Sequence, residues 1–242
     1  MAKKYELVKD DYIHYRWKIL YRIRALKDFG DVKAGDIGGY IESEKNLSHD
    51  GSCWVYDNAK VYGNAEVFGH SKIYGNAQVY GFTKVYNNAE VYGDVKVFGH
   101  SEIYGNAKVY SSVMVFGNAQ VYEDAKIYGN TWIYGNSKVC GGAEVYGSAS
   151  VYGNAYVYEG AIVGKVSTPY KNIFQYQCRH RLLTAILTEC DEILYTLGCQ
   201  ENITKEEFMD RIYNEDGGLG NNPHREEYLR LIPLVESYFK GE

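Results

Sequence analysis

Residues 61–78 have the sequence VYGNAEVFGHSKIYGNAQ, three six-residue repeats that follow one another without a gap. The same period extends over residues 53–164, where every sixth position from Val55 through Val163 is Val or Ile. An aromatic residue follows in nearly every repeat, then a turn pair that is often Gly-Asn, a small residue and a variable residue. Self-similarity at a short fixed period is the signature of a solenoid, in which each repeat packs on its neighbours.

Each position of the repeat has a physical reason. Side chains alternate across a strand, so the Val or Ile points inward while the aromatic and variable residues on either side point outward. Gly or Asn at the turn permits the positive φ that a sharp corner requires. The small residue fits inside that corner. The repeat therefore predicts a parallel β-solenoid.

The pattern resembles the hexapeptide repeat of left-handed β-helix proteins, in which an aliphatic residue is followed four positions later by a small one. In that family three hexads form one triangular coil. The resemblance implies about six coils for residues 53–164 and a rise of roughly 29 Å at ~4.8 Å per coil. We predict a mainly β protein built around a left-handed parallel β-helix. The hand comes from the resemblance, because the period alone does not show it.

Stacking the coils places the outward aromatic residues in three columns. These are Tyr56, Tyr74, Tyr92, Tyr110, Tyr128 and Tyr146; Tyr62, Tyr80, Phe98, Phe116, Tyr134 and Tyr152; and Phe68, Tyr86, Tyr104, Tyr122, Cys140 and Tyr158. One interpretation is a structural ladder, ring on ring, that stabilises the contact between coils. The other is an aromatic binding surface, since large exposed apolar patches usually mark contact sites.

One variable column becomes apolar in the middle of the solenoid. Lys60, Gln78 and Lys96 are followed there by Met114 and Trp132. The repeat requires nothing apolar at this position. Together with their aromatic neighbours they form our candidate binding site, which consists of Met114, Phe116, Trp132 and Tyr134. The alternative is that a flanking segment packs over Trp132.

Residues 1–52 do not follow the repeat and are predicted to be an N-terminal β cap. Within them, residues 18–26 alternate apolar Tyr21 and Ile23 with charged Arg22, which indicates a half-buried strand. The end of a solenoid is an unpaired β edge that natural proteins cover. We expect this segment to cover it.

Residues 165–242 are predicted to form a small α+β module, a β-hairpin followed by two helices. The hairpin strands are expected at 182–188 and 192–198. A capping box at 204–207 opens a helix that ends near Asn214, and Pro223 begins a second helix that ends near Phe239. The residues at helical spacing in that second helix, which we expect to be buried, are Tyr228, Leu231, Ile232, Leu234, Val235 and Tyr238.

Composition excludes several classes of partner. The net charge is −5, and no segment has the basic character that nucleic-acid binding normally needs. No stretch has the apolar length of a membrane span. The five cysteines are odd in number and irregularly spaced, which suits reduced thiols in a cytoplasm. We therefore predict a cytoplasmic protein with neither a nucleic-acid nor a membrane partner.

The sequence favours no catalytic site. Many proteins with this resemblance are acyltransferases that place a histidine and an acyl-donor cleft at trimer interfaces. Here the solenoid histidines, His70 and His100, occupy turn positions on different corners, so they cannot converge within one subunit. We interpret both as turn residues and predict no cofactor.

A metal site is also not predicted. Cys178, His180, Cys190 and Cys199 are four potential zinc ligands, but the hairpin would carry Cys190 about eight residues away from the others, roughly 25 Å. The adjacent basic cluster Arg179, His180 and Arg181 is a second candidate binding site, for an anion or an acidic partner; a solvated strand end is the alternative.

The chain also resembles phage and prophage proteins that are loosely labelled transferase-like or polymer-forming. The residues that carry this resemblance, besides the solenoid, are 20–25, 38–44, 46–48, 197–200 and 206–208. It implies a phage-type accessory protein in the host cytoplasm. The leading hypothesis is a non-enzymatic binding or scaffold protein that contacts a host protein, such as a defence component, or a phage structural protein. The alternative is an acyltransferase acting as a trimer. In both cases we expect a homo-oligomer.

Overall fold

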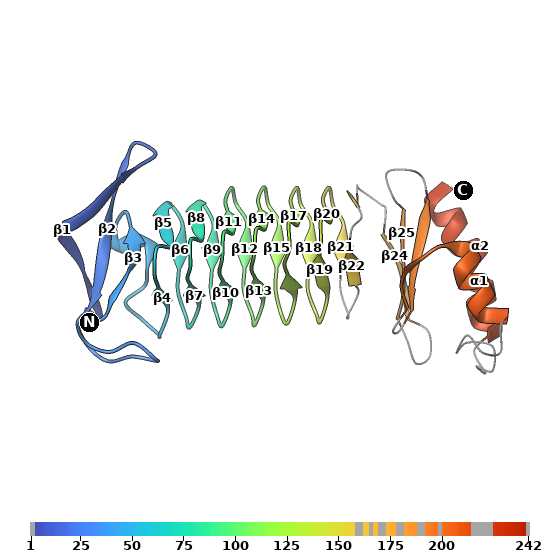
Figure 1. Ribbon diagram of the computed structural model, residues 1–242, viewed down its shortest axis with the longest axis horizontal. Coiled ribbons are helices and arrows are strands. Elements are labelled where there is room, and N and C mark those ends of the chain that lie inside the picture. The colour runs from blue at the N-terminus through green and yellow to red at the C-terminus, as the bar shows by residue number, and fades with distance from the viewer. Residues whose placement is uncertain are drawn as a thin grey trace.

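The computed structural model describes residues 3–157, 162–164, 167–168, 173–177, 182–187, 192–197, 200–213 and 225–240. The protein is a rod, with the N-terminal strands at one end, the solenoid in the middle and a mixed sheet-and-helix module at the other end (Figure 1). Among the described residues, no helix is both long and apolar enough to cross a membrane.

The solenoid has three parallel sheets, one for each side of the coil, as the resemblance to hexapeptide-repeat proteins implied. The β4 face contains β4 (Trp54–Val55), β7 (Lys72–Ile73), β10 (Glu90–Val91), β13 (Lys108–Val109), β16 (Lys126–Ile127), β19 (Glu144–Tyr146) and β22 (Ile162–Gly164). The β6 face contains β6 (Glu66–Val67), β9 (Lys84–Val85), β12 (Glu102–Ile103), β15 (Gln120–Val121), β18 (Lys138–Val139) and β21 (Tyr156–Val157). The β5 face contains β3 (Ile37–Ile41), β5 (Lys60–Gly63), β8 (Gln78–Gly81), β11 (Lys96–Val97), β14 (Met114–Val115), β17 (Trp132–Ile133), β20 (Ser150–Val151) and β23 (Ser167–Thr168).

Each coil is hydrogen-bonded to the next through its backbone. The amide of Tyr92, for example, donates to the carbonyl oxygen of Val109 at 2.9 Å. The inward Val and Ile residues from 55 to 157 are at most 1% exposed and form one continuous core. The tight corners depend on glycine. Gly105 has φ +73°, and a Cβ there would lie 2.6 Å from the amide nitrogen of Glu123 in the next coil.

Some corners hold Ser or Thr where most hexads have Ala. These residues are buried, so their hydroxyl groups need a partner inside the protein. The hydroxyl of Ser71 donates to the carbonyl oxygen of Phe68 at 2.9 Å, and that of Thr83 donates to the carbonyl oxygen of Tyr80 at 2.9 Å. In each case the hydroxyl donates to the carbonyl oxygen three residues earlier in the chain. The buried hydroxyl is therefore satisfied, and a small polar residue can replace Ala at the corner.

The N-terminal segment extends the parallel stacking beyond the hexads. β1 (Tyr5–Tyr15) and β2 (Lys18–Ala25) form an antiparallel hairpin, and β2 also pairs antiparallel with β3. β3 then pairs in parallel with β5, and a bridge joins Leu47 to Val67, which brings the solenoid to about seven turns. The predicted strand at 18–26 is confirmed as β2, whereas β1 was not predicted.

The C-terminal module is a four-stranded antiparallel sheet with two helices. Its elements are β24 (Ile173–Gln177), β25 (Leu182–Leu187), β26 (Ile193–Leu197), β27 (Gln200–Ile203), α1 (Lys205–Tyr213) and α2 (Arg225–Lys240). The predicted hairpin is confirmed as β25 and β26, while the two outer strands were not predicted. The capping box is confirmed too, because the Thr204 amide donates to Glu207 Oε2 and the Glu207 amide donates to Thr204 Oγ1.

The two faces of this sheet have different neighbours. Ile186 belongs to the solenoid core and Leu194 packs against it. The opposite face packs against the helices through Leu183, Ala185, Tyr195 and Leu197. The sheet therefore continues the solenoid core on one face and builds a core with the helices on the other.

The predicted buried face of the second helix was partly wrong. Tyr228, Leu231, Ile232 and Val235 are buried, but Leu234 is 49% exposed and Tyr238 is 43% exposed. Consecutive residues of an α-helix point in different directions, so the face that buries Val235 leaves Leu234 exposed. The helix places Val235 toward the sheet, and Phe239 continues that row.

Candidate interaction face of the solenoid

Most of the outward aromatic residues stack ring on ring as ladders, whereas Tyr56 meets Tyr74 edge-on, with ring planes at 85°. On the β5 face, the rings of Tyr62, Tyr80, Phe98, Phe116, Tyr134 and Tyr152 have centroids 4.9–5.2 Å apart and planes within 5° of parallel. This distance is close to the spacing between neighbouring strands, so the backbone sets it. The ladder interpretation is confirmed. A ladder still exposes the outer edges of its rings, so it does not exclude a binding role.

The structure brings the four candidate residues of the solenoid together. Met114 pairs with Trp132 in register across β14 and β17. Phe116 stacks on Tyr134 with centroids 4.9 Å apart. Met114, Phe116 and Tyr134 are half-buried, while Trp132 is 46% exposed. These four residues form what we call the Met-Trp patch, which spans two adjacent coils.

The tip of the β1–β2 hairpin covers the start of the same aromatic column. The Tyr15 ring lies 5.7 Å from that of Tyr62, and its hydroxyl donates to Gln78 Oε1 at 2.8 Å. The Arg16 guanidinium lies 5.3 Å from the centroid of Tyr80. Tyr62 is only 4% exposed as a result, and burial raises the pKa of Tyr62 to about 12.

The alternative raised for Trp132 was that a flanking segment packs over it. A flanking segment does pack on the β5 face, but it contacts the coils that hold Tyr62 and Tyr80. Within the part of the chain that the structure describes, Trp132 keeps 46% of its surface exposed. Among the described residues, the Met-Trp patch is therefore a partly exposed continuation of a face whose first coils accept aromatic contacts.

A hollow of about 370 Å³ lies beside the patch. Its lining residues are Asn76, Gln78, Asp94, Lys96, Ser112 and Met114. The Asn76 side chain donates to Asp94 Oδ1 at 3.0 Å along the corner. The patch is thus apolar and is bordered by charged and uncharged polar residues. Protein interfaces have the same arrangement, with an apolar centre and a polar rim.

The two solenoid histidines lie on different corners, as predicted. His70 Nδ1 is 2.9 Å from Ser52 Oγ, whereas the His100 ring stacks on Phe82 with centroids 4.9 Å apart. Each histidine contacts the residue one coil away in its own corner column. They do not converge on one site.

The C-terminal candidates cannot be placed in the same way. The basic cluster Arg179, His180 and Arg181 lies outside the described residues, as do Cys178, Cys190 and Cys199. Among the residues that are described, no group of three or more His, Cys, Asp or Glu side chains is arranged to hold a metal ion.

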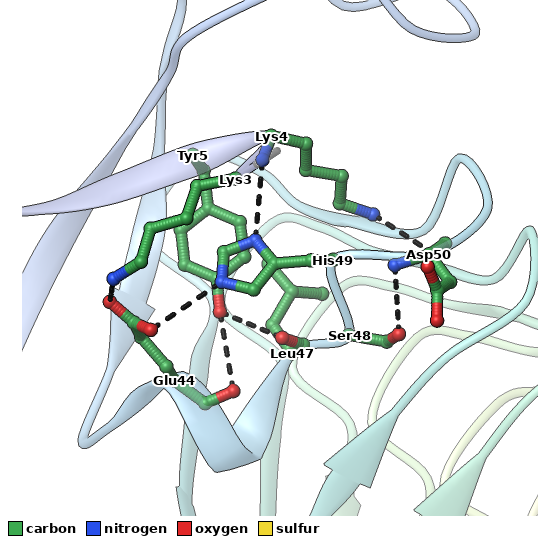
Figure 2. Close-up of polar contacts among 8 residues, drawn as sticks. All are labelled: Lys3, Lys4, Tyr5, Glu44, Leu47, Ser48, His49 and Asp50. Carbon is green, nitrogen blue, oxygen red and sulfur yellow. Dashed lines mark hydrogen bonds and ion pairs between the residues drawn. The ribbon is translucent and has the colours of Figure 1, made fainter. Parts of the chain in front are cut away.

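A polar cluster in the N-terminal cap was missed by the sequence analysis (Figure 2). Lys4 is 1% exposed, and its ammonium donates to the carbonyl oxygens of Cys53 at 2.9 Å, Gly51 at 3.3 Å and Asp50 at 3.4 Å. Burial lowers the pKa of Lys4 and raises that of the Cys53 thiol, which lies 3.2 Å from the ammonium nitrogen.

The neighbouring histidine joins the same two segments. His49 Nδ1 accepts a hydrogen bond from the Lys4 amide at 3.3 Å, and its ring stacks on Tyr5 with centroids 4.3 Å apart. His49 Nε2 lies 3.5 Å from Glu44 Oε2, and the Tyr5 hydroxyl donates to the Leu47 carbonyl at 2.7 Å. Figure 2 shows these contacts tying the first strand to the turn before the first hexad. The cluster is explained by this structural role.

Comparison with known proteins gives limited information. No known protein family matches the chain. An uncharacterized acetyltransferase of Escherichia coli strain K12, YdcK, is 49% identical over 39 residues, which are 16% of this chain and 12% of the relative. The chain thus aligns with a small part of that protein. The similarity supports a repeat solenoid of the hexapeptide kind. It gives no support to the phage-type resemblance, which stays a prediction.

Proposed function

We propose that this protein is a non-enzymatic binding protein that contacts another protein through the Met-Trp patch. The observation that carries the proposal is the register pair Met114–Trp132 on an uncovered part of the β5 face. The hexad explains the Val, aromatic and Gly positions, but it does not explain two adjacent apolar residues at a variable position. Met and Trp are enriched at interface centres, and Trp is frequent among the residues that dominate binding energy.

The solenoid is suited to this role because it is rigid. Ring stacking and backbone hydrogen bonds hold Phe116 and Tyr134 in place before a partner arrives. A partner therefore orders few side chains of this protein, which lowers the entropy cost of association. The phage-type resemblance makes a host or phage protein the proposed partner. A second copy of the chain, giving the expected homo-oligomer, is the other occupant to test by sedimentation.

Replacing Trp132 by Ala is expected to separate binding from stability. An exposed side chain contributes little to folding, so the free energy of unfolding should change by less than about 0.5 kcal/mol. Binding should weaken by ~2 kcal/mol or more, about 30-fold. The partner is identified as a protein captured from lysate by the wild type and not by Trp132→Ala. Its dissociation constant is then measured with both purified proteins.

Tyr92→Ala is the matched control, because it removes an aromatic ring from a different face. Tyr92 stacks between Tyr74 at 4.6 Å and Tyr110 at 4.9 Å. Its loss should lower stability by about 1–3 kcal/mol and leave partner binding unchanged. If Trp132→Ala instead lowers the melting temperature by several degrees and alters no association, Trp132 has a packing role and the proposed site is wrong.

The acyltransferase alternative is favoured by one observation, the local similarity to a protein labelled as an acetyltransferase. It would require a second copy to complete a site, because His70 and His100 lie on separate corners of one subunit. Incubation with acetyl-CoA and a broad panel of acceptors discriminates the two functions. Tight donor binding or turnover would favour the enzyme and reject the binding protein.

A further inference from the structure

We propose that a pocket in the C-terminal module binds the guanidinium group of an arginine side chain. The pocket lies between β26, the start of α1 and the middle of α2, far along the chain from the Met-Trp patch. The proposal is independent of the proposed function. It rests on a buried hydroxyl group, on the charges around it and on the size of the pocket.

The pocket has a volume of about 190 Å³. It is lined by Glu192, Ile193, Tyr195, Lys205, Glu206 and Glu236. Binding pockets for whole small molecules are usually larger, about 300–1,000 Å³. This pocket therefore suits the head group of a side chain better than a complete cofactor.

Tyr195 lines this pocket, and its hydroxyl has no hydrogen-bond partner among the described residues. Tyr195 is 0% exposed, and its hydroxyl oxygen has no hydrogen bond to any described residue. The ring stacks on Phe208 with centroids 5.1 Å apart, so packing sets its position. Burial, together with the carboxylates of Glu236 and Glu206, raises the pKa of Tyr195 to about 12. Glu206 and Glu236 line the same pocket as Tyr195, and buried polar groups nearly always have a partner.

The charges around the pocket favour a cation. Three of its lining residues are glutamates, and Lys205 forms an ion pair with Glu236 through Oε1. Glu206 is exposed at the rim and adds a carboxylate to the one that Lys205 already pairs. Carboxylate oxygens accept hydrogen bonds and do not donate them, so the matching ligand offers several donors.

A guanidinium group fits these requirements better than an ammonium group. It has five N–H donors in one plane and can donate to a carboxylate in a bidentate manner. It has donors left for the Tyr195 hydroxyl oxygen, which the ligand reaches only when the side chains that bury this oxygen move aside. It is also more weakly hydrated than an ammonium group, so entering a pocket costs less. We therefore expect an arginine of a partner protein to insert here.

Titration of the full chain with Nα-acetyl-arginine amide tests the proposal. At constant ionic strength we expect a dissociation constant on the order of 1 mM, measured by nuclear magnetic resonance. The lysine analogue and the neutral citrulline analogue should each bind at least about tenfold more weakly. Equal binding of the arginine and lysine probes would overturn the guanidinium assignment. Absence of binding would mean that only water occupies the pocket.

Two variants and one control test whether the probe binds in this pocket. Tyr195→Phe and Glu206→Gln should each weaken the arginine probe about tenfold, which is the loss of one hydrogen bond to a charged group. Glu226→Gln is the control, because Glu226 is exposed in the first turn of α2 and does not line the pocket. If all three variants bind as the wild type does, the probe is held by general surface charge and the pocket is not its site.

The stability of Tyr195→Phe is a second readout that needs no ligand. The substitution keeps the ring and removes an unpaired buried hydroxyl, so the unliganded protein should melt at the same or a higher temperature than the wild type. Addition of the arginine probe should then raise the melting temperature of the wild type but not of the variant. A clear loss of unliganded stability would show that the hydroxyl already has a structural partner, which would reject the proposal.

Discussion

Replacing Val97 by Asp is expected to unfold the central coils of the solenoid together. Val97 is 0% exposed and is stacked between Val79 and Val115 in the neighbouring coils. The substitution loses about 1.5–3 kcal/mol of apolar burial. It also places an unpaired charge in the core, which costs several further kcal/mol. Because each coil is stabilised only by its neighbours, the loss spreads along the rod.

The measurement is thermal and denaturant unfolding followed by circular dichroism. Ile103→Asp, on the β6 face, should behave in the same way, because Ile103 is also 0% exposed. Lys138→Asp is the control, since Lys138 points outward and is exposed. A Val97→Asp protein that melts like the wild type would show that the inward register is wrong.

Raising the pH above 10 is expected to unfold the protein cooperatively. Burial raises the pKa of Tyr62 and of Tyr86 to about 12, and raises that of Tyr5, Tyr56 and Tyr74 as well. An unfolded tyrosine ionises near pH 10. The stability that these groups contribute is therefore fully present below pH 10 and is lost as the pH rises from 10 through the folded pKa values.

The magnitude is large because several tyrosines act in the same direction. For Tyr62, which is 4% exposed, a shift to about 12 corresponds to roughly 2–3 kcal/mol at pH 12. The lowered pKa of Lys4 acts in the opposite sense, since its burial penalty disappears as it loses its proton below pH 10.5. One lysine does not offset the tyrosines.

Tyrosinate absorbance and circular dichroism, recorded over the same pH range, measure this effect. The far-ultraviolet signal should be lost in one transition above pH 10, and the absorbance of the buried tyrosines should appear in that same transition. Tyr62→Phe keeps the ring and removes a titrating group, so its transition should begin at a higher pH than that of the wild type. A far-ultraviolet signal that stays unchanged after all the tyrosines have ionised would contradict the expected linkage.

Much of the Met-Trp patch was predictable because, in a solenoid, residues separated by one coil of sequence lie next to each other. Parallel pairing between consecutive coils puts residues 18 positions apart side by side, so Met114 had to lie beside Trp132 once the period was known. The same spacing predicted the ladders and the separation of His70 from His100. The exposure of Trp132 could not be predicted, because it depends on where the flanking segments go.

The six-residue period was enough to predict a parallel solenoid and its inward Val and Ile register, because both depend on contacts that repeat at a constant spacing. The three-sided coil and its outward columns followed from the resemblance to hexapeptide-repeat proteins. Tertiary structure alone decided the position of the Tyr15 hairpin tip over Tyr62, the burial of Lys4 against Cys53 and the pocket at Tyr195. The first two join segments more than 40 residues apart, and the third joins a strand to two helices. Each of these contacts occurs once in the chain, so no repeating pattern in the sequence reveals it. The residues meet only because the caps pack on the solenoid and the helices pack on their sheet.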